Sequence, residues 1–319
     1  MTAKGKRRRW WLLAAILLIV IVAWLALHSA IARNGPAVLD TVDRITGGSR
    51  DVELVHRAST GDSPFQKLRV YRGESGGNSK PVIIFAHGGS WRSGDPDDYG
   101  FVARAFVPEG FVVVLVGYRL GEGGEFPNML RDMANAVSWT KANIAEYGGD
   151  PDAIFVSGHS AGAYNAAMVA LDPQWLDDEG VGTDSIAGVI GLAGPYDFYP
   201  FDSDSTKAAF GDAPHPEATQ PINFAARDAP PMLLMTGLKD TTVEPRNSRA
   251  MAAVLQAAGN RAVLETYPEF DHTGMLTALA SPWRRDSTVI DRIIAFTRET
   301  HGDRNNANTP SVPVQAENR

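Results

Sequence analysis

Residues 153–171 read AIFVSGHSAGAYNAAMVAL, an apolar run of strand length followed by a turn and a helix of small residues. The turn at residues 158–162 is a G-x-S-x-G pattern, whose glycines leave room for a sharp strand-to-helix turn that exposes the serine hydroxyl. A second match, residues 73–77, lies in a polar loop with no helical pattern after it. Only Ser160 therefore has the sequence context of a nucleophile.

Strand-length apolar runs alternate with helical patterns on both sides of this turn. The first two runs alternate apolar and polar residues, as in a half-exposed antiparallel pair, whereas the later ones are almost wholly apolar, as when helices cover both faces. This order predicts one α/β domain with an eight-stranded, mostly parallel, doubly wound sheet. The expected strands are Asp51–Ala58, Lys67–Gly73, Val82–Ala86, Phe111–Gly117, Ala153–Ser157, Ala187–Ala193, Met232–Thr236 and Ala262–Tyr267, and the expected helices are Tyr99–Val107, Asn128–Tyr147, Ala161–Leu171, Arg246–Ala258 and Arg284–Thr297.

Two glycines follow the third expected strand, in the run His87-Gly88-Gly89-Ser90-Trp91. Glycines just beyond the carboxyl edge of a sheet leave backbone N–H groups unshielded, which suits an oxyanion hole. A glycine turn is also an ordinary structural feature. The functional interpretation therefore depends on Ser160 lying at the same edge.

An acid and a histidine should follow the nucleophile in that order, each after a late strand. Asp240 follows the seventh expected strand and His272 the eighth. Because the carboxyl ends of parallel strands lie at one edge of a sheet, we expect Ser160, Asp240 and His272 to converge. Glu244 is an alternative for the acid. The sequence has no H-E-x-x-H spacing and predicts no metal or cofactor.

Composition excludes several other chemistries. The chain has 319 residues and no cysteine, which excludes a disulfide framework, thiolate zinc sites, iron–sulfur clusters and a cysteine nucleophile. The net charge is −7, and five basic residues precede the first acidic one. Removing those five charges leaves −12 for residues 10–319. This negative charge argues against a nucleic acid as a partner, because nucleic acids bind to basic surfaces.

The N-terminal basic run is followed by Trp10–Leu27, 18 residues without a charge. A helix of that length spans about 27 Å, close to the ~30 Å hydrocarbon core of a bilayer. Residues 1–32 are therefore expected to be a membrane anchor whose basic end stays in the cytoplasm while the rest is exported to the periplasm or the exterior. The alternative is a signal peptide cleaved after Ala32, since Ala30-Ile31-Ala32 is an A-x-A-like site. Cleavage there would release a secreted protein.

The remaining boundaries follow from changes in polarity. Residues 33–50 are expected to be a polar linker with one short helix (Ala37–Ile45), and residues 51–301 the α/β domain. Residues 195–230 form the longest irregular connection and are expected to be a cap or pocket wall. Residues 302–319 are rich in polar residues and are expected to be a disordered tail.

The chain resembles the α/β-hydrolase esterases that carry an HGGxW oxyanion motif, a group that includes bacterial carboxylesterases, hormone-sensitive-lipase-like enzymes and kynurenine formamidase. The resemblance covers about residues 50–300. Its motifs occur in the expected order: His87–Trp91, Tyr118-Arg119, Tyr147-Gly148-Gly149-Asp150-Pro151, Gly158–Gly162, Asp240-Thr241-Thr242-Val243 and Asp271-His272.

The resemblance implies that Ser160 is the nucleophile, His272 the general base and Asp240 its orienting carboxylate. It also implies an oxyanion hole, formed by the backbone N–H groups of Gly88, Gly89 and Ala161.

Two features of the glycine loop bear on the substrate. Ser90 stands where the lipase-like members have a third glycine, which weakens assignment to that branch and leaves the formamidase type open. Trp91 either lines the acyl pocket or packs in the core.

The expected activity is hydrolysis of small to medium carboxylic esters by acyl transfer through serine, without a cofactor. One alternative is a formamide or amide hydrolase with the same triad. Another, of a different class, is a non-catalytic scaffold module of the same fold. Such modules typically lose a triad member, and none is missing here.

Overall fold

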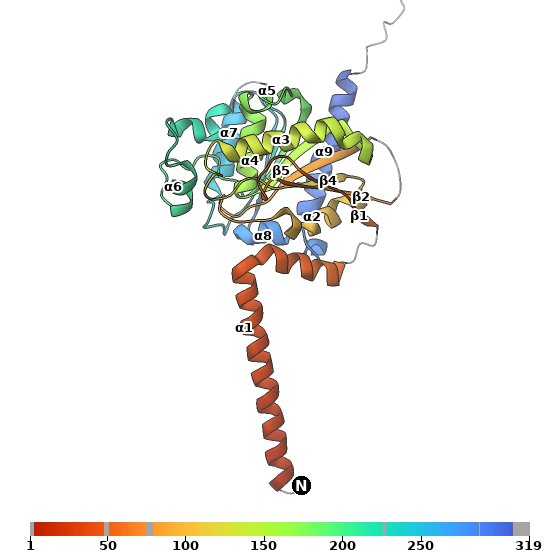
Figure 1. Cartoon of the computed structure of the whole chain (residues 1–319), viewed down its shortest axis with the longest axis vertical. Helices are drawn as coiled ribbons and strands as arrows, with labels where there is room; N and C mark the ends of the chain where they lie inside the picture. Colours follow the sequence, from red (N-terminus) through yellow and green to blue (C-terminus); the bar gives the residue numbers. More distant parts are fainter. Residues whose placement is uncertain (1–2, 48–50, 75–78, 226–227, 287, 309–319) are drawn as a thin grey trace, which may run out of the picture.

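The computed structural model describes residues 3–47, 51–74, 79–225, 228–286 and 288–308. Its centre is a single sheet with helices on both faces, and a long helix projects from one side (Figure 1). The strands are β1 (Val52–Ser59), β2 (Lys67–Gly73), β3 (Lys80–Ala86), β4 (Val112–Val116), β5 (Gly149–His159), β6 (Ile186–Leu192), β7 (Met232–Gly237) and β8 (Ala262–Tyr267). The helices are α1 (Ala3–Gly47), α2 (Gly100–Phe106), α3 (Asn128–Asn143), α4 (Ala161–Leu171), α5 (Gln174–Asp177), α6 (Asp204–Phe210), α7 (Arg246–Ala257), α8 (His272–Thr277) and α9 (Val289–Asn308).

The strand order across the sheet is β1-β2-β4-β3-β5-β6-β7-β8. Strand β2 pairs antiparallel with β1 and β4, and the remaining pairs are parallel. The expected eight-stranded, mostly parallel, doubly wound sheet is therefore confirmed. In consequence the carboxyl ends of β3, β5, β6, β7 and β8 lie along one edge.

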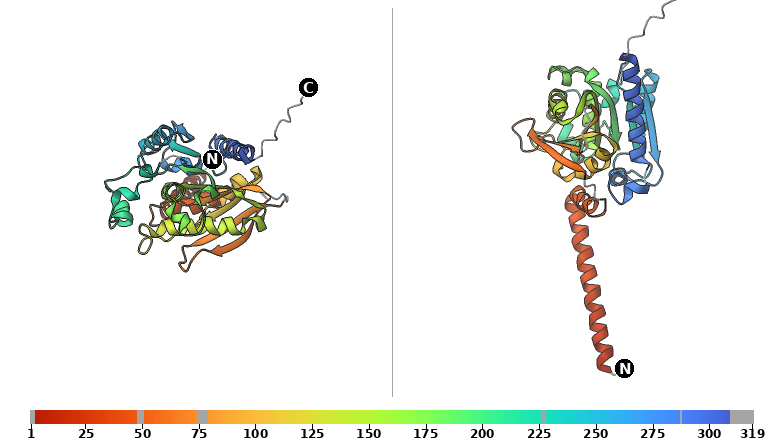
Figure 2. Two further views of the ribbon diagram at one scale, coloured as in Figure 1. Left: turned by 90° about the horizontal axis from the view of Figure 1, so that it is seen from above. Right: turned by 90° about the vertical axis from the view of Figure 1, so that its right-hand side faces the viewer.

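The apolar strands are explained by two cores, one on each face of the sheet. In β3, Val82, Ile84 and Ala86 pack into the core under α3, α4 and α7, whereas Ile83 and Phe85 pack into the core under α2, α8 and α9 (Figure 2). Successive side chains of a strand point to opposite faces, so a strand covered on both faces has no polar position.

The insert at residues 195–230 lies beyond the carboxyl end of β6 and contains α6. Phe198 and Phe210 of this insert pack with Trp91 from the loop after β3. The insert therefore packs against the loop at the carboxyl edge of the sheet.

The structure revises both ends of the expected domain. The segment expected to be a polar linker is helical as far as Gly47 and packs on the domain, with Asp40 and Asp43 buried. Its polarity is misleading because these two carboxylates are ion-paired with Arg104 inside the contact. At the other end, α9 begins later than expected and continues to Asn308. Residues 309–319 of the expected tail lie outside the described residues.

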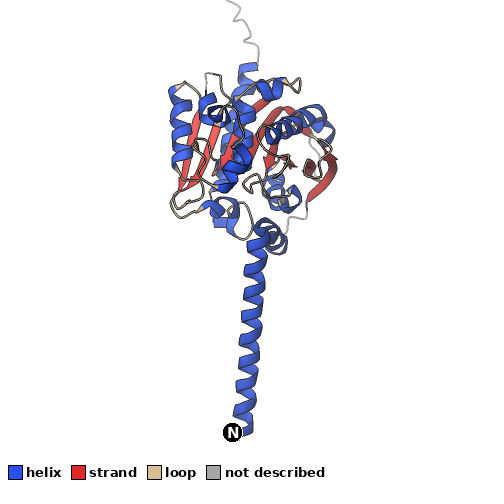
Figure 3. Cartoon of the chain, turned by 60° about the vertical axis from the view of Figure 1, so that its left-hand side comes forward, coloured by secondary structure: helices blue, strands red, loops and turns tan. Residues whose placement is uncertain are grey.

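Helix α1 consists of two parts joined at a kink at Asn34, where φ is −154° and ψ is 81° (Figure 3). Among the described residues, one stretch, within Ile16–Gly47, is long and apolar enough to cross a membrane. Its apolar window has a mean hydropathy of 2.2, and none of that window is buried against the domain.

Candidate active site

Ser160 occupies a strained turn between β5 and α4. Its φ of 55° and ψ of −120° lie in a region that residues other than glycine rarely adopt. The flanking glycines are required for space, because a Cβ at Gly158 would lie 2.3 Å from the Gly162 carbonyl carbon and a Cβ at Gly162 would lie 2.1 Å from the Ala86 oxygen. The predicted strand–turn–helix therefore projects the serine side chain from the carboxyl edge of the sheet. The second match to the pattern includes Ser75, which lies outside the described residues.

Three predicted residues form a continuous hydrogen-bonded chain at this edge. His272 Nε2 lies 2.9 Å from Ser160 Oγ, and His272 Nδ1 lies 2.8 Å from Asp240 Oδ2. The other carboxylate oxygen of Asp240 accepts hydrogen bonds from the backbone N–H groups of Thr242 and Val243, each at 2.9 Å. The carboxylate is thus held from both sides, and its side chain is fully buried.

The electrostatics of Asp240 favour the carboxylate. Burial alone raises its pKa, but the hydrogen bond from His272 and those from two backbone N–H groups outweigh burial, so the pKa of Asp240 is lowered from its ordinary value. An ionised Asp240 accepts the Nδ1 hydrogen of His272. Nε2 is then left as an acceptor that faces the Ser160 hydroxyl.

Two other carboxylates of this region, the alternative acid Glu244 and the surface residue Asp271, have other partners. Glu244 is largely exposed and pairs with Arg246 at 3.0 Å. Asp271 caps α8 by accepting a hydrogen bond from the Gly274 N–H at 2.7 Å. Neither carboxylate has a hydrogen bond to His272 among the described contacts, so the geometry selects Asp240.

His159, inside the turn, contacts His272, and the sequence did not predict this contact. Its Nε2 donates to the His272 carbonyl oxygen at 2.9 Å, and the two rings lie 4.7 Å apart. Burial, and then the charge of His272, lower the pKa of His159 to about 3, so this ring is neutral. The only available signal was its position beside Ser160, because its partner lies 113 positions away in the chain.

The glycine loop after β3 lies directly against the nucleophile. A Cβ at Gly88 would lie 3.3 Å from Ser160 Cβ, and Gly89 has a φ of +120° with no room for a side chain beside Ser93. The loop is braced from below, because the Tyr118 hydroxyl donates to the His87 carbonyl oxygen at 3.0 Å.

The residues of this loop that line the pocket beside Ser160 are Ser90 and Trp91. The roles of Gly88, Gly89 and Ala161 as donors to the oxyanion stay predictions.

Trp91 both packs and lines the pocket. Its ring is almost fully buried, lies edge-on to Tyr164 and Phe210 and stacks with Phe198. Its Nε1 donates to Asn165 Oδ1 at 3.3 Å. Trp91 is therefore packed in the core and also lines the pocket, while its role toward the acyl group stays a prediction.

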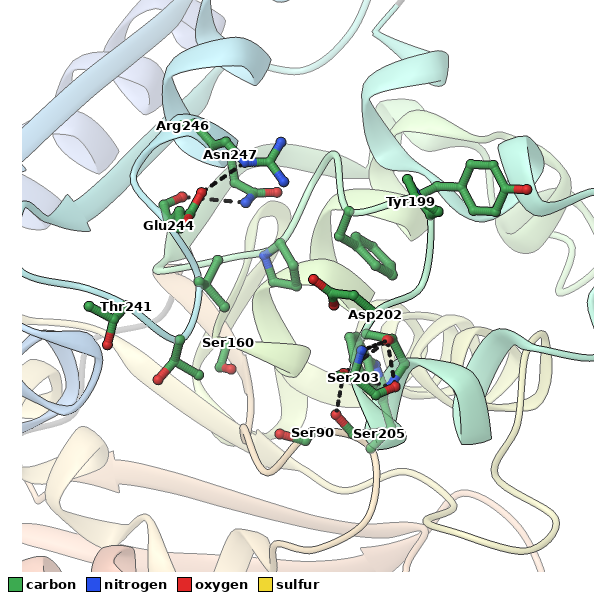
Figure 4. Close-up of a pocket in the computed structure, with 17 residues that line it drawn as sticks. Ser90, Ser160, Tyr199, Asp202, Ser203, Ser205, Thr241, Glu244, Arg246 and Asn247 are labelled. Carbon is green, nitrogen blue, oxygen red and sulfur yellow. Dashed lines mark hydrogen bonds and ion pairs between the residues drawn. The ribbon is translucent and has the colours of Figure 1, made fainter.

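Ser160 opens into a cavity of about 410 Å³ (Figure 4). One part of the wall is aromatic, and the part nearer the solvent carries hydroxyl, carboxylate and guanidinium groups. Among the described residues, no group of three or more histidine, aspartate or glutamate side chains is arranged to hold a metal ion. The lining residues are Ser90, Trp91, Ser160, Pro195, Phe198, Tyr199, Pro200, Asp202, Ser203, Ser205, Thr206, Thr241, Thr242, Val243, Glu244, Arg246 and Asn247.

Comparison with known proteins gives the family. The BD-FAE family model matches residues 68–255, which is more than half of the chain and contains the glycine loop, the Ser160 turn and Asp240. The chain belongs to the BD-FAE family. The expected resemblance to α/β-hydrolase esterases is thereby confirmed.

This BD-FAE chain is similar to several curated proteins. It is 31% identical to the esterase LipC of Mycobacterium tuberculosis over 69% of this chain and 60% of that protein. It is 27% identical to the kynurenine formamidase of Danio rerio over 69% of this chain and 74% of that protein. The chain spans about 60% of the length of the mycobacterial esterases that it matches.

Among solved structures, the fold of the BD-FAE chain is similar to that of an inhibited esterase B from Lactobacillus rhamnosis. The TM-score is 0.71 at 21% identity, and the match covers 92% of this chain and 99% of that one. At this identity the likeness concerns the fold.

Proposed function

We propose that this chain is a serine carboxylic-ester hydrolase for small to medium esters, with Ser160 as nucleophile, His272 as general base and Asp240 as the carboxylate that orients it. One observation carries the proposal: the hydrogen-bonded chain from Asp240 through His272 to Ser160 ends in an open cavity of about 410 Å³. The similarity to esterases supports the same reaction.

The reaction is a two-step acyl transfer. Ser160 Oγ attacks the ester carbonyl carbon while its proton moves to His272 Nε2, and the buried Asp240 carboxylate stabilises the resulting imidazolium. The tetrahedral intermediate collapses as His272 returns the proton to the leaving alcohol. Water, deprotonated by His272, then attacks the acyl-enzyme and releases the acid. No cofactor takes part in these steps.

We assign the oxyanion hole to the backbone N–H groups of Gly88, Gly89 and Ala161. Ala161 is the first residue of α4, so its N–H belongs to the positive end of a helix. Gly88 lies directly against the nucleophile, since a Cβ there would be 3.3 Å from Ser160 Cβ. Donors already fixed in place stabilise the developing charge without reorganisation.

Different parts of the cavity wall contact the acyl and the alcohol parts of the ester. Trp91 and Phe198 provide an apolar surface for the acyl group. The hydroxyl and charged groups of the insert and of the segment after Asp240 face the solvent side, where the alcohol leaves. The aromatic packing behind Trp91 closes the cavity and supports a preference for small to medium acyl groups.

A second candidate function, hydrolysis of formamides by the same triad, is favoured by the similarity to kynurenine formamidase. Relative kcat/KM values for p-nitrophenyl acetate and N-formylkynurenine distinguish the two. A higher value for the formamide overturns the ester assignment. Fluorophosphonate labelling tests the scaffold alternative, since a non-catalytic module leaves Ser160 unlabelled.

We further propose that the straight part of α1 anchors the protein in a membrane, with residues 10–27 in the bilayer, the N-terminus in the cytoplasm and the catalytic domain exported. The apolar, unburied stretch of α1 and the basic run before it support this orientation. N-terminal sequencing of the protein from membranes tests the anchor against the cleaved alternative. A sequence that begins at Arg33 overturns the anchor.

A further inference from the structure

The second part of α1, after the kink, packs one face against the catalytic domain and leaves the other face exposed. We define the basal surface as the exposed side chains of Arg33, Arg44, Ile45, Trp283 and Arg285. We propose that the basal surface rests in the phospholipid headgroup layer of the membrane, so that the catalytic domain is seated on the bilayer in one orientation rather than tethered above it. This inference rests on the proposed membrane anchor and goes beyond it.

The kink in α1 is fixed by a single side chain. Asn34 Oδ1 accepts a hydrogen bond from the Ala37 N–H at 3.1 Å, which caps the second part of the helix. Asn34 Nδ2 donates to Asp98 Oδ2 at 2.7 Å, in the short helix Pro96–Asp98 that follows the glycine loop. Asn34 therefore joins the start of the docked part of α1 to the catalytic domain at the kink.

Beyond the kink, the helix is clamped to the domain by buried carboxylates. Asp43 is fully buried, and its Oδ1 accepts hydrogen bonds from the Ser281 N–H at 2.7 Å and from Arg284 at 3.2 Å. Its Oδ2 pairs with Arg104, which also pairs with Asp40. Undocking this helix would leave buried charges without partners, which is strongly unfavourable. The part of α1 after the kink is thus firmly docked on the catalytic domain.

The opposite face of the docked helix is exposed. Ile45 is 79% exposed and Trp283 is 46% exposed. Trp283 belongs to the short helix Trp283–Asp286, which is joined to the end of α1 by a hydrogen bond from Arg285 to the Thr46 carbonyl oxygen at 3.4 Å. Both exposed apolar side chains therefore lie on one surface.

The position of this surface indicates what covers it. The docked helix lies across the base of the domain, on the side from which the long apolar helix leaves, in Figure 1, in the right-hand view of Figure 2 and in Figure 3. A bilayer crossed by that helix therefore meets this side of the domain first. Isolated exposed apolar residues are ordinary on protein surfaces, but tryptophan beside a membrane helix is typical of the lipid–water interface.

Charge supports the same partner. Residues 10–319 carry a net charge of −12, that is, −7 less the five N-terminal basic residues. The charged groups of the basal surface, by contrast, are the guanidinium groups of Arg33, Arg44 and Arg285, of which Arg44 also pairs with Asp40. The carboxylates of this region, Asp40 and Asp43, are buried and neutralised by arginines. A basic surface on an acidic body matches the phosphate groups of phospholipids.

The absence of cysteine from the chain allows a direct test. Single cysteines are introduced as Ile45→Cys and Trp283→Cys on the basal surface and as Asp178→Cys at the exposed end of α5, on the far side of the domain (Figure 1). Leu18→Cys, in the apolar part of α1, reports insertion. Each full-length variant carries an environment-sensitive fluorophore in vesicles of phosphatidylcholine and phosphatidylglycerol. Lipids with a spin label near the headgroup serve as quenchers.

We expect blue-shifted, quenched fluorescence at positions 45 and 283 and unquenched fluorescence at position 178. Equal signals at positions 45, 178 and 283, with blue-shifted fluorescence at position 18, overturn the inference and leave the anchor in place. Fluorescence at position 18 without a blue shift overturns the anchor and the inference together, whereas hydrolysis of p-nitrophenyl acetate reports the esterase separately. The double variant Arg44→Glu/Arg285→Glu should reduce quenching at position 283 without a change in that hydrolysis, and undiminished quenching contradicts the role of charge.

Discussion

Replacing Asp240 by asparagine should reverse the hydrogen bonding of the catalytic histidine without disturbing the fold. Asp240 Oδ1 accepts hydrogen bonds from the N–H groups of Thr242 and Val243, and Oδ2 accepts one from His272 Nδ1. An asparagine must turn its carbonyl toward the two backbone donors, because the other orientation sets its NH₂ group against both of them. That NH₂ group then faces His272 Nδ1. His272 is forced into the tautomer with its hydrogen on Nε2, which donates to Ser160 and no longer accepts its proton.

The magnitude follows from losing the general base while the nucleophile and the oxyanion donors stay in place. General-base catalysis contributes about 10²–10⁴-fold, and the corresponding substitution in a serine protease triad lowers kcat by about 10⁴-fold. We expect a fall in kcat of about 10³–10⁴-fold for Asp240→Asn, which is about 4–5 kcal/mol of transition-state stabilisation. KM should change little, because Asp240 does not line the cavity.

The assay is steady-state hydrolysis of p-nitrophenyl butyrate by the full-length protein, with thermal unfolding as the check on folding. The matched control is Glu244→Gln, which neutralises an exposed carboxylate on the same segment and should retain activity within a few-fold. An Asp240→Asn variant that keeps more than about a tenth of the wild-type kcat refutes the tautomer reasoning. An equal loss in Glu244→Gln refutes the choice of acid.

Three other outcomes test the surroundings of the site. Trp91→Ala opens the acyl wall, so the kcat/KM ratio of p-nitrophenyl octanoate to butyrate should rise about tenfold, and an unchanged ratio contradicts a pocket-lining role. Burial lowers the pKa of His87 to about 4 and that of His159 to about 3. In the unfolded chain both histidines have ordinary pKa values near 6.5, so below about pH 6.5 the unfolded chain binds more protons than the folded one. Urea unfolding should therefore show a loss of about 4 kcal/mol from about pH 8 to pH 5, and a flat profile contradicts buried neutral histidines. Asp43→Asn should lower the free energy of unfolding by about 3 kcal/mol, and a thermal shift no larger than that of the exposed control Thr41→Ala contradicts the clamp.

Much of the site was predictable because its residues depend on the sheet. Strand β7 is a short, mostly apolar run and β8 a short strand that begins with three apolar residues, and Asp240 and His272 follow them closely in sequence. In a parallel sheet, residues that follow different strands meet at one edge. Residues far apart in the chain can therefore be predicted to lie close together from the strands that they follow. The same reasoning located Ser160 and the glycine loop.

Features that depend on a partner far away in sequence were not predictable. The docked part of α1 has the polarity of a linker, and only the structure shows that the partners of Asp43 are Arg104 and the Ser281 N–H, which lies 238 positions away. The contact of His159 with the His272 carbonyl oxygen depends in the same way on how two loops fold together. Local patterns report the period of an element and its ends, and they carry no information on such pairs.

The most direct test of the proposed mechanism is covalent labelling of the folded, full-length protein with a fluorophosphonate, followed by mass spectrometry of the modified peptide. We expect one adduct, on Ser160, with hydrolysis of p-nitrophenyl butyrate lost in proportion to labelling. Ser160→Ala should show neither adduct nor turnover, whereas Ser75→Ala, at the second G-x-S-x-G match, should show both. Wild-type turnover in Ser160→Ala, or an adduct on a different residue, would contradict the assignment of Ser160 as the nucleophile.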